Sequence, residues 1–133
     1  MGQQQLLLII LGVIVVGIAV VVGITMFQDN AISANRDAVT NDLVNLGARA
    51  QQYYRRPIAL GGGGNSFTGL TMAKLTQPVS GSAWTNPNGT YTIQSQDSAQ
   101  VTLKGLGVEK SSGQPVQVTA RSTSDSLVTT VIN

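Results

Sequence analysis

The sequence predicts an α+β fold: a long N-terminal helix, apolar in its first half and amphipathic in its second half, packed on a small C-terminal antiparallel β-sheet. Three observations support this prediction. Residues 1–28 carry no charge. Residues 29–56 repeat apolar side chains at heptad spacing, which indicates an amphipathic helix. Residues 90–133 contain short alternating segments separated by turn residues, which indicates strands. The glycine-rich residues 57–89 are expected to form the loop region between helix and sheet.

Residues 6–24 form an unbroken run of Leu, Ile, Val, Ala and Gly. As a helix this run measures about 29 Å, close to the thickness of the hydrocarbon core of a bilayer. The helices of soluble domains are rarely apolar on all sides for such a length. A cleaved secretory signal usually has a shorter apolar region, a basic start and a small-residue cleavage site, which this segment lacks. The run therefore predicts a retained, membrane-length helix.

Small residues lie along one side of this predicted helix. Gly12, Ala19 and Gly23 are seven and four positions apart, which places them on one face. Such a face lets a second helix approach closely. A solitary anchor does not need it, although glycine is common in membrane helices generally. We therefore favour the core of a helical filament, with a single-pass anchor for a surface or periplasmic β-domain as the alternative.

The helix is expected to continue beyond the apolar run. Polar residues surround an apolar seam at spacings of four and three, which consists of Val39, Leu43, Leu46, Ala50 and Tyr53. Arg55 and Arg56 suit the negative end of a helix, and Pro57 follows them directly. The sequence thus predicts one helix from about Gln3 to Arg56.

Beyond the helix the sequence predicts loops and then strands. Gly61 to Gly64 indicate a flexible loop, and residues 71–77 are compatible with a short helix. A meander of three to four antiparallel strands is expected over residues 90–95, 100–104, 115–121 and 127–132, with turns at 96–98, 105–113 and 122–126. Because a small sheet is marginal alone, the seam of residues 39–53 is its expected cover.

The composition argues against catalysis and against nucleic-acid binding. The chain has no Cys and no His, which removes the usual zinc ligands, thiol nucleophiles and imidazole bases. We expect no enzymatic activity, cofactor or metal site. The net charge of +2 is spread along the chain without a basic stripe. Asp97, Glu109 and Asp125 match no metal-ligand spacing and are expected to be solvated. Residues 88–90 (Asn-Gly-Thr) match the N-glycosylation pattern, but a hairpin turn is favoured there.

This order of elements resembles the type IV pilins and pseudopilins. In motif terms the resemblance is confined to residues 1–28 and to the Tyr53-Tyr54 end of the helix. It implies a structural subunit of an extracellular filament, a type IV pilus or fimbrium on the cell surface, which polymerises through its apolar helix. It also implies a membrane-inserted precursor pool, an inner-membrane assembly machine with its ATPase, and a prepilin peptidase responsible for cleavage and methylation. A secretion-system pseudopilin is the alternative within the family.

The resemblance implies that the residues at the start of the chain take part in processing and assembly. Cleavage is expected between Gly2 and Gln3, a junction similar to archaeal class III leaders, although the leader Met1-Gly2 lacks the usual basic residues. The family's glutamate at the fifth mature position is replaced by Gln5, counted from Met1, or by Leu7, counted from Gln3. We expect the amides of residues 3–5 to hydrogen-bond the terminal amine within the filament core. A polar cap at the membrane surface is the alternative.

Overall fold

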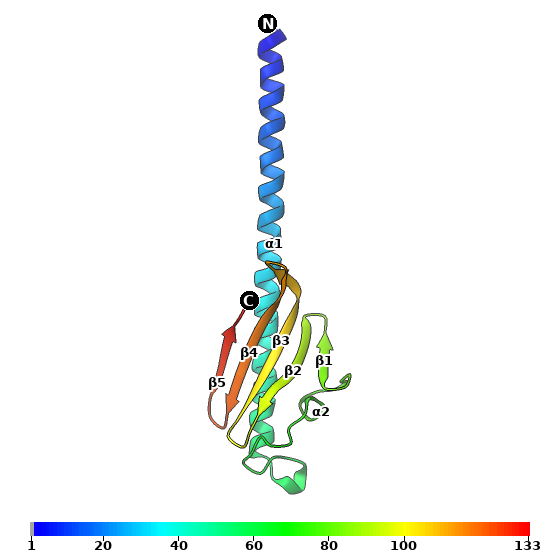
Figure 1. Cartoon of the computed structure of the whole chain (residues 1–133), viewed down its shortest axis with the longest axis vertical. Helices are drawn as coiled ribbons and strands as arrows, with labels where there is room; N and C mark the ends of the chain where they lie inside the picture. The colour runs from blue at the N-terminus through cyan, green and yellow to red at the C-terminus, as the bar shows by residue number, and fades with distance from the viewer. Residues whose placement is uncertain (1) are drawn as a thin grey trace. The chain divides into compact units, whose positions relative to one another are not determined.

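The structure is a computed structural model that describes residues 2–133, and it confirms the predicted α+β class. The elements are helix α1 (Gly2–Arg55), the 3-10 helix η1 (Ile58–Leu60), helix α2 (Met72–Leu75) and strands β1 (Ala83–Asn86), β2 (Gly89–Gln96), β3 (Gln100–Ser111), β4 (Gln114–Thr123) and β5 (Leu127–Val131) (Figure 1). They fall into two compact units, one ending at Ala31 and the other comprising Ile32–Asn133.

Helix α1 contributes to both units as one uninterrupted helix of 54 residues. No proline occurs in residues 2–56, so no backbone donor is missing inside it. The helix ends at Arg55, because Pro57 disfavours helical dihedral angles at the residue before it. The basic side chain of Arg55 lies in the last turn, where it complements the negative end of the helix dipole.

The sheet is an antiparallel meander in the order β1-β2-β3-β4-β5, with five strands where the sequence predicts three to four. The additional strand is β1, which lies within residues 57–89, the range expected to form loops. It pairs with β2 in a register that places Trp84 opposite Tyr91 and Asn86 opposite Gly89. β1 has only four residues, too few for an alternating pattern to be recognised in the sequence.

The prediction of a turn over residues 105–113 is wrong, because β3 continues to Ser111. Glycine is typical of turns, but Gly105 and Gly107 lie within the strand, at positions where α1 packs closely on the sheet. A Cβ on Gly105 would lie 2.7 Å from Cγ1 of Val39 and 3.0 Å from the ring of Tyr91. A Cβ on Gly107 would overlap with Oδ1 of Asn35. These glycines therefore mark close helix–sheet packing, and the turn is confined to the region of Ser112 and Gly113.

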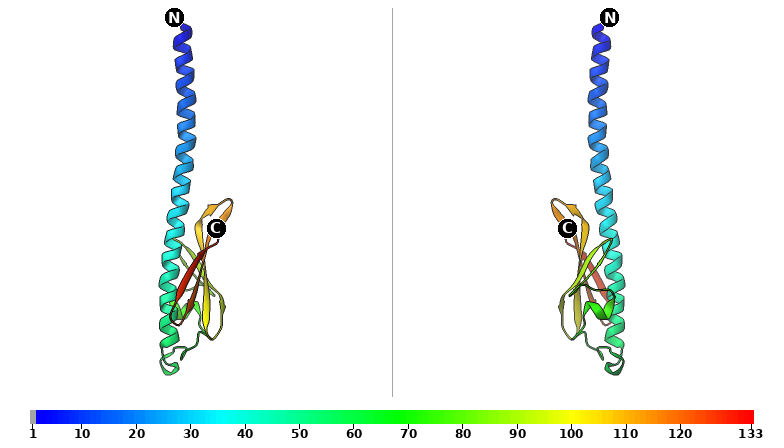
Figure 2. Two further views of the ribbon diagram at one scale, coloured as in Figure 1. Left: turned by 90° about the vertical axis from the view of Figure 1, so that its left-hand side faces the viewer. Right: turned by 90° about the vertical axis from the view of Figure 1, so that its right-hand side faces the viewer.

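The core of unit Ile32–Asn133 lies between α1 and one face of the sheet (Figure 2). All five seam residues of α1 are buried in it. The sheet contributes five fully buried aliphatic side chains: Val101, Leu103, Val116, Val118 and Ala120. Residues from the connecting segment close one end: Phe67, Leu70, Met72 and Leu75. Each fully buried large aliphatic side chain stabilises the fold by about 1.5–3 kcal/mol relative to its exposed state.

The glycine loop that follows α1 is an ordered cap, although the sequence indicates a flexible loop. The backbone N–H of Gly63 donates to the carbonyl of Tyr53 at 2.9 Å, and that of Asn65 donates to the carbonyl of Tyr54 at 2.7 Å. These carbonyls belong to the last turn of the helix, where they have no partner within the helix. Gly63 packs so closely against the backbone of Ser66 and the ring of Tyr53 that a Cβ would clash with both.

Because unit Ile32–Asn133 has a core of its own, we expect a fragment lacking residues 1–28 to fold as a soluble monomer. Its far-ultraviolet circular dichroism should show helix and sheet, and it should sediment as a single species of monomer mass. Persistent oligomers, or the spectrum of an unfolded chain, would show that the apolar segment is needed for this unit to fold.

Candidate functional site

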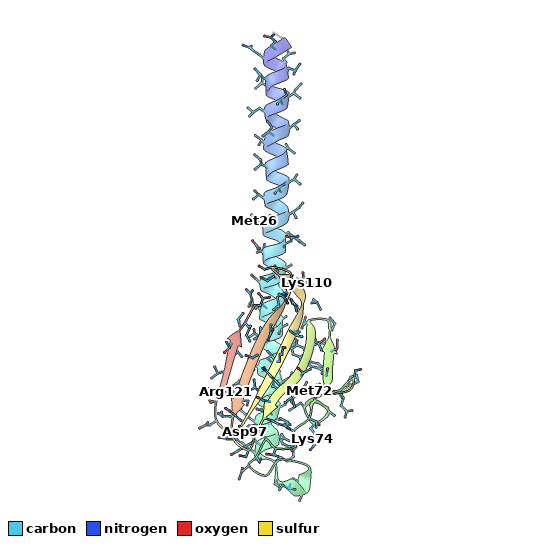
Figure 3. The ribbon with its side chains drawn as sticks, in the orientation of Figure 1. Met26, Met72, Lys74, Asp97, Lys110 and Arg121 are labelled. Atoms are coloured by element: carbon cyan, nitrogen blue, oxygen red, sulfur yellow. The ribbon has the colours of Figure 1, made fainter. Side chains whose placement is uncertain are left out.

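The apolar segment of α1 has no covering element within its own unit. Every Leu, Ile, Val, Met and Phe side chain between Leu6 and Phe27 is between 49% and 76% exposed. Side chains surround the helix axis on all sides along this segment (Figure 3). The most apolar 18-residue window has a mean hydropathy of 3.3, so by length and composition the helix can cross a membrane. Thr25 donates its hydroxyl to the carbonyl of Val21 at 3.0 Å, which satisfies its polar group locally.

The small-residue face lies within this exposed segment. A Cβ added at Gly12 or at Gly23 would meet no other atom within 4 Å. No close contact among residues 2–133 therefore accounts for these two glycines, and Ala19 is exposed between them. Gly17 has the same open surroundings, but at about 100° per residue it faces away from the Gly12, Ala19 and Gly23 face.

The residues implied in processing lie in the first turn of α1. Gly2 and Gln3 are helical and exposed, as is Gln5, whereas Met1 lies outside the described residues. The side-chain amides of residues 3–5 take part in none of the hydrogen bonds formed among residues 2–133. The cleavage after Gly2 and the amide interaction with the terminal amine stay predictions.

A polar cluster around Asp42 connects α1 to the β1–β2 hairpin. Oδ2 of Asp42 accepts three hydrogen bonds, from Nδ2 of Asn86 at 2.9 Å, from Nδ2 of Asn88 at 3.0 Å and from the hydroxyl of Tyr91 at 2.5 Å. Asn86 also accepts hydrogen bonds from the backbone N–H groups of Asn88 and Gly89, which fixes the turn. All three donors to Asp42 are neutral, so the cluster holds a carboxylate by hydrogen bonds to neutral groups.

This cluster displaces two pKa values in opposite directions. Burial by itself raises the pKa of Asp42, but the hydrogen bonds from Tyr91, Asn86 and Asn88 together outweigh it and hold that pKa below its ordinary value. For Tyr91, burial and the neighbouring Asp42 carboxylate act together and raise the pKa of the phenol well above its ordinary range. The ionised carboxylate and the neutral phenol are therefore the stable forms over a wide range of pH.

A second polar connection lies one heptad earlier on α1. The side chain of Asn35 donates to the carbonyl of Asn88 at 2.8 Å and accepts from the N–H of Glu109 at 3.2 Å. Together with Asp42 it engages Asn88 from two sides. The amide nitrogen that N-glycosylation would modify is therefore already bonded to a carboxylate within the fold, in agreement with the hairpin-turn interpretation of residues 88–90.

The structure does not bring the carboxylates of Asp97, Glu109 and Asp125 together into one site. Asp97 lies in the β2–β3 turn, where Oδ1 accepts from the N–H groups of Ala99 and Gln100. These backbone hydrogen bonds lower the pKa of the Asp97 carboxyl. Glu109 precedes Lys110 in β3, and Lys110 lies towards the other end of the sheet from Asp97 (Figure 3). Within residues 2–133 no three Asp or Glu side chains come together as a metal site would require.

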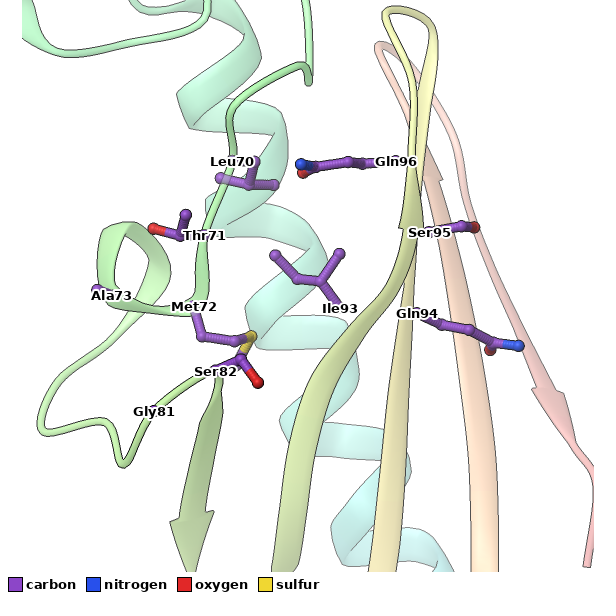
Figure 4. A pocket seen from close by; sticks show the side chains of 10 residues that line it. All are labelled: Leu70, Thr71, Met72, Ala73, Gly81, Ser82, Ile93, Gln94, Ser95 and Gln96. Atoms are coloured by element: carbon purple, nitrogen blue, oxygen red, sulfur yellow. The ribbon is translucent and has the colours of Figure 1, made fainter.

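Two hollows of unit Ile32–Asn133 are lined partly by residues of β1 or β2. One, of about 460 Å³, lies between the segment Leu70–Ala73 and the end of β2, with Ile93 and Met72 pointing into it and Gln94 pointing away (Figure 4). The other, of about 290 Å³, lies between α1 and Trp84. The first is uncharged, whereas the second contains Asp42 and Arg49.

Sequence reasoning missed the Asp42 cluster and the hollow beside Trp84. The sequence does contain a signal for those residues of the cluster and the hollow that lie on α1. Asp42, Asn45, Arg49 and Gln52 each precede a seam residue by one position, so they repeat at spacings of three and four along one polar stripe. Nothing in the sequence shows that Trp84 faces this stripe, because that depends on the pairing of β1 with β2.

Comparison with protein-family models, with curated proteins and with solved structures finds no match. The architecture itself is type IV pilin-like: a long N-terminal helix, apolar in its first half, whose second half packs on an antiparallel sheet.

Replacing Tyr91 with Phe should destabilise the fragment of residues 29–133 by about 1–3 kcal/mol at pH 7, since a buried hydrogen bond to a carboxylate is lost. The loss should depend on pH. Asp42 has a lowered pKa in the folded state, so its contribution is present above about pH 4 and decreases as the pH falls below that value. Tyr91 has a raised pKa, so its contribution is present below about pH 10 and decreases as the pH rises further.

The difference between wild type and Tyr91→Phe should therefore shrink at both extremes, as measured by urea unfolding across the pH range. Tyr54→Phe is the matched control, because the Tyr54 hydroxyl makes none of the hydrogen bonds formed among residues 2–133. A difference that stays constant with pH would mean that the Tyr91–Asp42 hydrogen bond contributes little.

Proposed function

We propose that this chain is a structural subunit of an extracellular, type IV pilus-like filament, with no enzymatic activity, assembled through residues 1–28 of α1. The observation that carries the proposal is the exposed apolar segment with its small-residue face. The precursor would lie in the membrane, and many copies would form the filament core with the β-domain outside. Assembly would require inner-membrane machinery and a prepilin peptidase acting between Gly2 and Gln3.

The exposed apolar segment supports the proposal because contact between its side chains and water is energetically unfavourable. More than a dozen large aliphatic side chains there are about half or more exposed, and each would gain about 1.5–3 kcal/mol on full burial. An apolar environment is therefore required, and either a bilayer or a bundle of identical helices provides one. Since lipid is as apolar as a leucine-rich helix surface, moving from the first to the second depends on close packing and not on the hydrophobic effect.

The Gly12, Ala19 and Gly23 face is the feature that favours the bundle. Helix–helix association in apolar surroundings depends on backbones that approach closely, which small residues permit. A head-to-tail contact that repeats without closing produces a helical polymer of identical subunits. The single-pass anchor explains the hydropathy of the segment equally well but gives no reason for this face. A secretion-system pseudopilin would use the same helix in a shorter assembly.

Gly12→Leu and Gly23→Leu test the proposal. Material sheared from the surface of expressing cells should contain filaments of the wild-type chain, visible by negative-stain microscopy and identified by mass spectrometry. Both variants should remain in the membrane fraction but yield at least about tenfold fewer filaments, because the leucine side chains hold neighbouring helices apart.

Gly17→Leu is the matched control, since it makes the same chemical change on a different face of the helix. It should give near wild-type yield. Absence of wild-type filaments, with the chain confined to membranes, would favour the single-pass anchor. Filaments of normal yield from both Gly12→Leu and Gly23→Leu would remove the packing argument.

A further inference from the structure

The hollow of about 290 Å³ between α1 and β1 has the lining of a small-ligand site. Its apolar lining consists of Leu46, Ala48 and an aromatic wall, Trp84. The remaining lining is the polar stripe of α1, which comprises Asp42, Asn45, Arg49 and Gln52. An apolar surface with a small number of polar groups at defined positions is typical of sites that bind small molecules.

The aromatic wall is held in place from behind. The rings of Trp84 and Tyr91 are 5.2 Å apart between centroids and tilted by 32°. Tyr91 is fully buried, and its hydroxyl is bonded to Asp42. Trp84 is half-buried, so part of its ring is covered by the fold while part lines the hollow. A ligand would thus meet an aromatic surface whose orientation is already fixed, which lowers the entropic cost of binding.

The carboxylate of Asp42 is also held in place, and one of its two oxygens remains able to accept hydrogen bonds from a ligand. Oδ2 of Asp42 accepts all three hydrogen bonds of the cluster, and Oδ1 accepts none of the hydrogen bonds formed among residues 2–133. Arg49 is held by a hydrogen bond from Nη1 to the carbonyl of Leu75 at 2.9 Å, and its other N–H groups make none of the hydrogen bonds formed among residues 2–133. Asn45 and Gln52 are exposed, and each amide supplies both a donor and an acceptor.

We propose that this hollow binds a neutral saccharide of at least two rings, with one ring face on Trp84 and hydroxyl groups of the saccharide on Asp42, Asn45, Arg49 and Gln52. A pyranose presents apolar C–H groups on its ring face and hydroxyl groups around its edge. The face covers the aromatic ring and removes apolar area from water. Each hydroxyl both donates and accepts, which matches a lining that contains acceptors only at Asp42, donors only at Arg49 and both at the two amides.

The charges of the lining favour a neutral ligand over an ionic one. A cation on Trp84 would gain from the aromatic face and from Asp42, but it would lie close to the guanidinium of Arg49. An anion would be favoured by Arg49 and repelled by Asp42. Because one charge of each sign lines the same hollow, a charged ligand is attracted by one of these two side chains and repelled by the other. A polyhydroxylated neutral ligand uses both ends.

Trp84 is the single tryptophan of the chain, so the fluorescence of the chain reports on the surroundings of this one side chain, which lines the hollow. The full-length chain would be kept in a detergent without a sugar headgroup, such as a polyoxyethylene ether. It would be titrated with maltose, cellobiose, lactose and N,N′-diacetylchitobiose over roughly 0.1 to 50 mM, a range suited to a few hydrogen bonds and one stacked ring. At least one disaccharide should produce a saturable change in emission, whereas sorbitol, a polyol without a ring face, should not.

Two variants of exposed helix residues separate binding at this hollow from other effects. The double variant Asn45→Ala/Gln52→Ala removes two side chains that make no hydrogen bond among residues 2–133, so the fold should be unaffected. It should raise the Kd at least about tenfold. Asn41→Ala, an exposed asparagine outside the hollow, is the matched control and should bind like wild type. No saturable change with any of the four disaccharides, or an unchanged Kd in the double variant, would overturn the proposal, whether or not filaments form.

Discussion

The contact between the seam of α1 and one face of the sheet is the interaction on which the rest of unit Ile32–Asn133 depends. The apolar face of the five-stranded meander is unfavourable in water until it is covered, and the seam residues of α1 are buried against it. The contact is close because the sheet and the helix each carry a glycine that faces a side chain of the other. Gly105 on β3 makes room for Val39, and a Cβ on Gly47 of the helix would lie 2.6 Å from the side chain of Leu127. Interiors packed this closely tolerate few changes of volume, so these glycines fix the distance between helix and sheet.

Hydrogen bonds fix the position of the helix along the sheet, which apolar packing alone does not specify. Asn35 and Asp42 lie one heptad apart and both bind the β1–β2 hairpin through Asn88, while Gln51 donates to the carbonyls of Thr123 and Ser126 at the β4–β5 turn. The helix is thus connected to turns at both ends of the sheet. Because an ionised carboxylate that accepts several hydrogen bonds is costly to leave without them, a shift of the helix by one turn would be strongly disfavoured.

The sequence was sufficient to predict the helix, the seam and the antiparallel class of the sheet, because hydrophobic periodicity directly reflects which faces are buried. It was insufficient for β1, whose four residues are too few to show a period. It was misleading at Gly105 and Gly107, since glycine serves both turns and close contacts, and only the position of α1 distinguishes the two. The Asp42 cluster and the hollow beside Trp84 join residues some forty positions apart, and no local pattern reports such a pairing. The assembly residues Gln5, Gly12, Ala19 and Gly23 stay predictions, because they concern contacts between chains.

We infer that residues 6–24 pack against the same residues of other copies, and disulfide crosslinking is a direct test of this packing. The chain has no Cys, so each position from Leu6 to Ile24 can be replaced singly by Cys and the isolated membranes and sheared surface material oxidised. This packing predicts dimers whose yield varies with the helical period of about 3.6 residues and is highest on the Gly12, Ala19 and Gly23 face. Absence of dimers at every position in both fractions would contradict it and leave α1 as the anchor of a solitary β-domain.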